Sequence, residues 1–185
     1  HADKNSFGGF SYFNSAAVAA HYLSRYGRVA LLDIDYHHGS GHQEIFYARQ
    51  SVFTLSIHAD PDYEYPYFSG FRGERGKGAG EGYNVNYPLP DGVTGGQYLT
   101  VLKRAKREMR SFGPDFLVLS LGFDTAKGDP TGTWKLQKTD FRNNGRLIGA
   151  LGVPVLVVQE GGYNSRLLGV NARYFFTGLW EGVYQ

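Results

Sequence analysis

RVALLDIDYHHG, residues 28–39, is an apolar run that ends in carboxylates, imidazoles and a glycine. A nearly continuous apolar run, as opposed to an alternating one, is typical of a strand buried on both faces of a parallel sheet. Three further runs of this kind predict strands at residues 52–58, 116–121 and 153–159. Because the intervening segments are long enough to hold helices, we predict an α/β fold.

Helical periodicity occupies several of the segments between these strands. Thr94 and Gln97 have the spacing of a capping box, apolar residues then recur at helical intervals, and Gly113 ends the segment. Similar patterns predict helices at residues 11–26, 139–151 and 165–180. Residues 60–82 show neither period and predict a long loop. We therefore expect one domain over residues 1–185, with a mostly parallel sheet flanked by helices on both faces.

The composition excludes several classes of protein. Hydrophobic residues make up 42% and charged residues 19% of the 185 positions, which is too apolar for a disordered chain. No apolar run reaches the roughly 18 residues of a membrane span. The absence of cysteine excludes disulfides, thiolate zinc sites and a cysteine nucleophile. The net charge of +2 lacks the strong basic excess of nucleic-acid-binding proteins. We therefore expect no membrane and no nucleic-acid partner.

The residues that follow the strands predict a metal site. In an extended backbone Asp33, Asp35 and His37 project from one face. Asp124 follows the third predicted strand, at the edge of the sheet where open α/β folds bind ligands. Taken alone, Asp124 is more typical of a helix N-cap, but together with Asp35 and His37 it completes a set of one nitrogen and two oxygen ligands. Three protein ligands and one open position are typical of catalytic zinc, although manganese or iron suits such a set too.

EGGY, residues 160–163, follows the last predicted strand. The two glycines allow a close approach of the backbone and direct the phenol of Tyr163 toward the same edge of the sheet. A phenol remains protonated at neutral pH and can donate a hydrogen bond to a developing oxyanion. A tyrosine that only packs in a glycine turn is the structural alternative.

Four motifs in this order resemble the zinc-dependent deacetylases of the arginase-like fold, which include histone deacetylases and bacterial acetylpolyamine amidohydrolases. They are HA at residues 1–2 with GGFSYFN at 8–14, DIDYHHGSG at 33–41, LGFDT at 121–125 and EGGY at 160–163. The resemblance implies that Asp35, His37 and Asp124 bind one catalytic Zn²⁺. It also implies that Tyr163 polarises the scissile carbonyl.

His1 resembles the second of the family's two adjacent catalytic histidines, which acts as general base and acid. Asp33 resembles the carboxylate that orients the first of them. Ser40 stands where the family often carries Asn or Asp beside the second histidine. The first histidine is absent and family members are considerably longer, so we expect residues 1–185 to be the C-terminal portion of a longer catalytic domain.

The resemblance further implies one or two structural K⁺ ions. The inner site would be formed by the Asp33 carboxylate, backbone oxygens of Asp35, His37 and Ile57, and Ser56. The outer site would use backbone oxygens of Phe46, Arg49, Val52 and Tyr83.

Phe10 and Tyr65 resemble the two aromatic walls of the family's substrate tunnel, and we expect Gly9 and Gly162 to contribute to substrate binding beside them. YPYFSG, residues 65–70, looks more like the acetylpolyamine amidohydrolases than the eukaryotic histone enzymes. The same loop carries three acidic residues that would attract a cationic amine, namely Asp60, Asp62 and Glu64.

We therefore expect hydrolysis of acetylated polyamines to acetate and free amine, with lysine deacetylation of acetyl-lysine peptides as the alternative. A binuclear manganese hydrolase of the arginase kind and an inert fragment are further hypotheses. The resemblance to bacterial enzymes implies a cytoplasmic location, and it is compatible with a homodimer.

Overall fold

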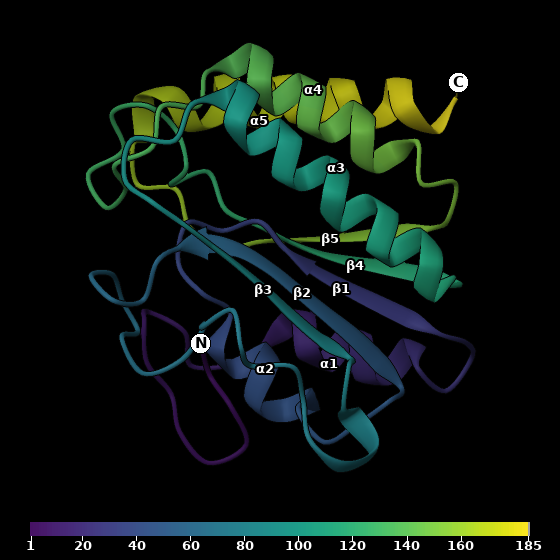
Figure 1. The fold of residues 1–185 in the computed structure, drawn as a ribbon. Coiled ribbons are helices and arrows are strands. Elements are labelled where there is room, and N and C mark those ends of the chain that lie inside the picture. The colour runs from purple at the N-terminus through teal and green to yellow at the C-terminus, as the bar shows by residue number, and fades with distance from the viewer. Residues whose placement is uncertain (185) are drawn as a thin grey trace.

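A computed structural model describes residues 1–184, in which five parallel strands form one sheet in the order β3-β2-β1-β4-β5 (Figure 1). The strands are β1 (Val29–Asp33), β2 (Val52–Ala59), β3 (Asn84–Leu89), β4 (Phe116–Leu121) and β5 (Val155–Gln159). Every residue of β1 and β2 is buried, as expected for a sheet covered on both faces.

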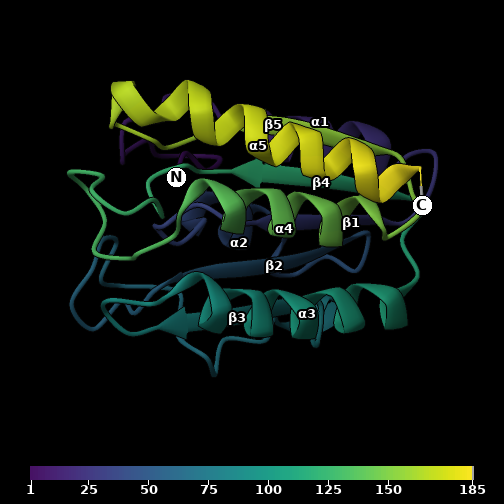
Figure 2. The same ribbon diagram turned by 90° about the horizontal axis from the view of Figure 1, so that it is seen from above.

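Helices cover both faces of this sheet. One face carries α3 (Gly95–Phe112), α4 (Lys138–Gly149) and α5 (Ser165–Val183), as Figures 1 and 2 show. The other face carries α1 (Ser15–Leu23) and α2 (Ser40–Phe46), and the 3₁₀ turn η1 (Gly78–Gly80) interrupts a long loop. This arrangement confirms the predicted α/β fold with helices on both faces. Within residues 1–184, no helix has the length and apolar character that crossing a membrane requires.

The termini of α3 follow the predicted signals. Thr94 and Gln97 form the capping box, and Gly113 ends the helix in the left-handed conformation with φ of 68°. Its apolar stripe, which includes Leu102 and Met109, packs against the sheet in the larger of two core clusters. Helix propensity, the capping residues and the amphipathic spacing all indicate a helix here, which is why α3 could be predicted from the sequence.

Two elements were not predicted, β3 and α2. Pro88 lacks the N–H that a central strand would need, and β3 tolerates it because β3 lies at an edge of the sheet. Its buried Asn84 and Asn86 each donate a side-chain hydrogen bond to Gln43 of α2, at 2.9 and 2.8 Å. These polar side chains hydrogen-bond to one another across the two elements. Neither element therefore shows the periodic spacing of apolar residues from which strands and helices are predicted.

Helices α4 and α5 pack closely through glycines. A Cβ added at Gly145 or Gly149 of α4 would overlap the backbone of α5, and one added at Gly178 or Gly182 would overlap the backbone of α4. These contacts fix the C-terminal half of α5 against α4.

The carboxyl ends of the central strands meet at one edge of the sheet. Asp33, the last residue of β1, is in register with Ser56 of β2 and Ser120 of β4. In Figure 1 the N-terminus lies at this same side of the molecule. The predicted site residues at these strand ends are therefore brought together by the topology.

Candidate metal centre

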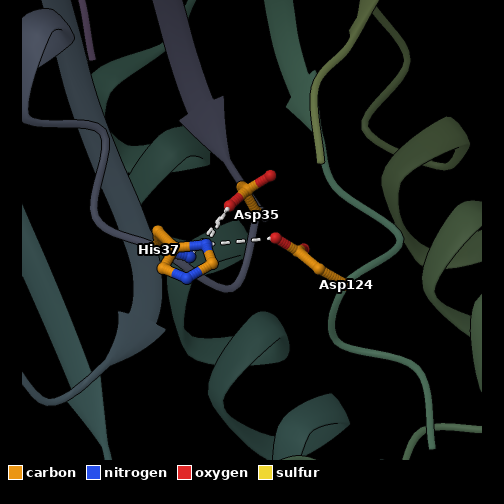
Figure 3. Close-up of side chains that lie close together, drawn as sticks. All are labelled: Asp35, His37 and Asp124. Atoms are coloured by element: carbon orange, nitrogen blue, oxygen red, sulfur yellow. Dashed lines mark hydrogen bonds and ion pairs between the residues drawn. The ribbon is translucent and has the colours of Figure 1, made fainter. Parts of the chain in front are cut away.

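Asp35, His37 and Asp124 converge at the carboxyl ends of β1 and β4 (Figure 3). His37 Nδ1 lies 3.4 Å from Asp35 Oδ1 and 3.2 Å from Asp124 Oδ2. One ligand atom from each residue lies within 4.8 Å of the other two. Within residues 1–184 this is the one group of three or more such side chains that meets this spacing. The convergence predicted from the sequence is therefore present.

Backbone N–H groups hold the two carboxylates in place. Asp35 Oδ2 accepts a hydrogen bond of 2.8 Å from Gly161 N, and Asp124 Oδ1 accepts one of 3.0 Å from Tyr36 N. Gly161 has to be a glycine, because a Cβ there would overlap both carboxylates. The EGGY segment therefore supplies a backbone donor to the site, which sequence reasoning missed.

The electrostatics of the cluster favour a cation. Asp124 is 0% exposed, and burial together with the charge of Asp35 raises its pKa to about 7. Burial is the largest single influence on Asp35 and opposes its charge, but the hydrogen bonds and charge of His37 and a hydrogen bond with Asp124 together lower the pKa of Asp35. For His37, burial alone would lower the pKa, whereas hydrogen bonds with Asp124 and Asp35 raise it to about 10. Two buried carboxylates and one imidazole aimed at a common point fit a divalent metal ion.

Asp33 lies behind this cluster and is equally buried. Its Oδ1 accepts a hydrogen bond of 3.0 Å from Asp35 N, and its Oδ2 lies 3.2 Å from His42 Nδ1. Burial and the neighbouring Asp35 raise the pKa of Asp33 well above its usual range, while burial lowers that of His42 to about 4. His42 was not predicted as a site residue, but its ring lines the cavity beside Asp33.

A cavity of about 750 Å³ opens in front of the cluster. Besides the candidate ligands Asp35 and His37, its lining includes six residues that the sequence singled out: His1, Gly9, Phe10, Tyr65, Asp33 and Tyr163. Ser120 and Glu160 also line the cavity. The Ser120 hydroxyl donates a hydrogen bond of 3.2 Å to the Glu160 carboxylate. Gly162 does not line it, because that glycine packs against Phe123. The expected direct contribution of Gly162 to the substrate site therefore finds no support in the geometry.

Tyr163 lies at the edge of this cavity and is 42% exposed. Burial, followed by the charges of Asp35 and Asp124, raises its pKa to about 12, so the phenol stays protonated at neutral pH. Asp129 holds the turn before α5, because its Oδ2 accepts hydrogen bonds from Tyr163 N at 2.7 Å and Asn164 N at 3.0 Å. The role of Asp129 was not predicted, although the Gly128-Asp129-Pro130 sequence is typical of a turn.

His1 and two aromatic residues form the rest of the cavity wall. His1 Nδ1 lies 3.2 Å from Ser40 Oγ, and its ring meets Tyr65 edge-on at 4.8 Å. The ring of Phe10 meets Tyr163 at 5.9 Å but is 86% exposed. Tyr65 therefore forms a wall near the candidate metal ligands, whereas Phe10 stands at the outer rim.

The residues expected around two monovalent cations lie in different parts of the sheet. Ser56 and Ile57 lie toward the carboxyl end of β2, where Ser56 Oγ contacts His58 Nδ1 at 2.8 Å. The outer group lies at the opposite end, where Val52 begins β2 in register with Val29. There Phe46 O accepts a hydrogen bond of 2.8 Å from Arg49 N, and Tyr83 O accepts one of 3.0 Å from Thr54 N. Both potassium sites stay predictions.

Comparisons with known proteins identify the family. The histone deacetylase domain family matches residues 1–179. The acetylpolyamine amidohydrolase of Burkholderia pseudomallei (strain 1710b) is 51% identical over 180 residues, which is 97% of this chain and 53% of the relative. Acetylpolyamine amidohydrolase 2 of Pseudomonas aeruginosa is 46% identical over 187 residues, covering 100% of this chain and 54% of the relative.

A solved structure gives the same result. The crystal structure of acetylpolyamine aminohydrolase from Burkholderia pseudomallei superposes with a TM-score of 0.96 at 49% identity, covering 98% of this chain and 54% of that one. The chain thus spans about half the length of the relatives it matches. Since the family match covers nearly all of its residues, the chain belongs to the histone deacetylase domain family.

Proposed function

We propose that this chain carries the metal centre of a zinc-dependent amidohydrolase that removes acetyl groups from acetylated polyamines. The observation that carries the proposal is the convergence of Asp35, His37 and Asp124 within 4.8 Å beside an aromatic-lined cavity. Membership of the histone deacetylase domain family supports zinc as the metal. The three side chains would hold it and leave a coordination position for water and substrate.

A bound zinc ion would supply a water of lowered pKa and a Lewis acid for the amide carbonyl. The protein would supply the proton transfers. Because Nδ1 of His1 is engaged by Ser40 at 3.2 Å, Nε2 is the nitrogen left to take a proton from the water and give it to the leaving amine. By its resemblance to the family's orienting carboxylate, Asp33 would orient a further histidine from behind the site.

Tyr163 would stabilise the oxyanion. Its raised pKa of about 12 keeps the phenol protonated, so its O–H can donate a hydrogen bond to the oxygen as negative charge develops there. The hydrogen bonds from Tyr163 N and Asn164 N to Asp129 fix the turn that carries the ring. The aromatic rings of Phe10 and Tyr65 would flank the acyl chain and the methylene groups of the amine.

The substrate class rests on the relatives and on the rim loop. Two relatives that are 51% and 46% identical bear the name acetylpolyamine amidohydrolase. Asp60, Asp62 and Glu64 lie in the loop that carries Tyr65, and their negative charge would attract a cationic amine. We also propose that the buried carboxylate of Asp33 belongs to an inner K⁺ site, with the outer site at the other end of β2.

The test is a comparison of substrates on the complete protein. We expect acetylputrescine or acetylspermidine to be hydrolysed with a higher kcat/KM than an acetyl-lysine peptide, and Asp124→Ala to abolish both reactions. A strong preference for the peptide would move the assignment to lysine deacetylation, which the 36% identity to histone deacetylase RPD3 of Saccharomyces cerevisiae would then support. No turnover with zinc present would contradict the proposed activity.

A further inference from the structure

Each candidate metal ligand has a second polar atom that points away from the shared centre. For the two aspartates this atom is a carboxylate oxygen, and the backbone holds it: Gly161 N donates to Asp35 Oδ2 at 2.8 Å, and Tyr36 N donates to Asp124 Oδ1 at 3.0 Å. For His37 it is Nε2, because Nδ1 faces the carboxylates. The question is what holds Nε2.

Glu64 of the rim loop is the acidic residue nearest to this atom. Its Oε1 lies 4.0 Å from His37 Nε2, and among residues 1–184 no other carboxylate lies within that distance of Nε2. The same Oε1 accepts a hydrogen bond of 3.1 Å from Tyr65 N, and Glu64 N donates one of 3.1 Å to Asp60 O. The side chain is 24% exposed. The carboxylate is therefore anchored beside the imidazole.

A metal-bound imidazole almost always donates its other ring N–H to a carboxylate, a backbone carbonyl or a water. A neutral histidine that binds a metal through Nδ1 carries its proton on Nε2, and a carboxylate that accepts this N–H fixes the tautomer and the ring orientation. A separation of 4.0 Å is longer than a direct hydrogen bond of about 2.7–3.2 Å. The direct hydrogen bond would therefore need a rotation of the Glu64 side chain toward Nε2.

We propose that Glu64 is a positioning residue for the metal centre, which accepts the Nε2–H of His37 and so increases the affinity of the site for zinc. This inference rests on the proposed function, because it assumes that His37 is a metal ligand. It assigns Glu64 a role different from that of its acidic neighbours. Asp62 lies two residues away on the same loop and is exposed, so it can add only to the general negative charge.

The experiment compares Glu64→Gln with Asp62→Asn in the complete protein, since each removes one negative charge from the same loop. Zinc affinity is measured by competition with a chromophoric chelator. We expect Glu64→Gln to bind zinc about 10-fold more weakly, the lower end of the effect typical of such partners. Asp62→Asn should stay within about twofold of the unsubstituted protein, because an exposed charge is screened. Equal affinities for Glu64→Gln and the unsubstituted protein would overturn the inference, and so would equal losses in both variants.

A second readout follows the Nε2 proton itself. In the cobalt-substituted protein, the N–H of a coordinated imidazole gives a hyperfine-shifted proton resonance, and its exchange with solvent should be faster in Glu64→Ala than in Asp62→Asn. The Glu64→Asp variant keeps the charge and should bind zinc more tightly than Glu64→Ala. This comparison tests the role of Glu64 if Glu64→Gln folds poorly. An unchanged exchange rate in folded Glu64→Ala would contradict the role.

Asp124→Ala separates this inference from the proposed function. If the unsubstituted protein binds zinc and Asp124→Ala does not, the metal centre stands whatever Glu64→Gln does. If zinc binding is unaffected by Asp124→Ala, the metal centre itself is wrong, and the role of Glu64 falls with it.

Discussion

The buried carboxyl of Asp124 makes a quantitative prediction about the metal-free protein. Its pKa is raised to about 7 by burial and by the charge of Asp35, against 3.8 for an ordinary aspartate. Between these two values the folded state keeps a proton that the unfolded state has lost. The stabilisation is therefore complete below pH 3.8 and is lost as the pH rises through about 7.

The size of the effect follows from the two pKa values. Between pH 5 and pH 8, the single group lowers the free energy of unfolding by about 3 kcal/mol, from the linkage relation at 1.36 kcal/mol for each pKa unit. His37 acts in the same direction at higher pH. Its pKa is raised to about 10, so the stability that its charge contributes is lost as the pH rises through that value. Buried His42, whose pKa is lowered to about 4, acts in the opposite direction, so the prediction concerns the difference between the unsubstituted protein and a variant without the Asp124 carboxyl.

Urea unfolding of the chelator-treated protein at both pH values measures this difference, and Asp124→Asn is the matched variant. The asparagine is neutral at both pH values, so the change in the free energy of unfolding from pH 5 to pH 8 should be more favourable in the variant by about 3 kcal/mol. Added zinc should stabilise the unsubstituted protein more at pH 8 than at pH 5, since metal and protons compete for the same ligands. Identical pH dependence in Asp124→Asn and in the unsubstituted protein would refute the reasoning.

Three further predictions concern the turn, the helix packing and the rim loop. Tyr163→Phe should lower kcat about 100-fold and leave the zinc affinity unchanged, because it removes one hydrogen-bond donor to the oxyanion. Steady-state kinetics and a zinc titration measure the two effects, and a loss of zinc affinity would contradict this role. Gly178→Ala should destabilise the protein by about 1–3 kcal/mol, because the added Cβ would overlap the backbone of α4. Gly169→Ala in the same helix should stabilise the protein by about 0.5–1 kcal/mol, because no atom lies near the added Cβ and alanine favours the helix. Equal thermal midpoints for the two would contradict the packing. Glu74→Ala should increase proteolysis within residues 60–82, because Glu74 Oε2 accepts hydrogen bonds from Gly70 N at 2.7 Å and Phe71 N at 3.1 Å; an unchanged cleavage rate would show that other contacts hold the loop.

The strands and the ligand set were predictable because each depends on a local pattern. The apolar run before Asp33 identifies β1 and places Asp35 and His37 just past its end, although residues 35–37 form a bend and not the extended chain from which their common face was predicted. Asp124 could be added because parallel strands bring their carboxyl ends to one edge. These inferences require only backbone geometry and the order of elements.

The supporting contacts could not be predicted, because they join segments that are far apart in the sequence. Gly161 N reaches Asp35 over 126 residues, and Asp129 anchors a turn that begins 34 residues later. A backbone donor leaves no trace in residue type, and a single aspartate in a loop has many ordinary uses. The proximity of Glu64 to His37 is likewise set by the path of residues 60–82, for which the sequence indicates only a loop.

The most direct test of the metal centre is an anomalous difference map, collected at the zinc edge from crystals of the complete protein grown with zinc. We predict a single peak per chain between Asp35 Oδ1, His37 Nδ1 and Asp124 Oδ2, matched by one zinc per chain in elemental analysis. Two adjacent peaks would favour the binuclear alternative, and a map without density among these three atoms would contradict the proposed function.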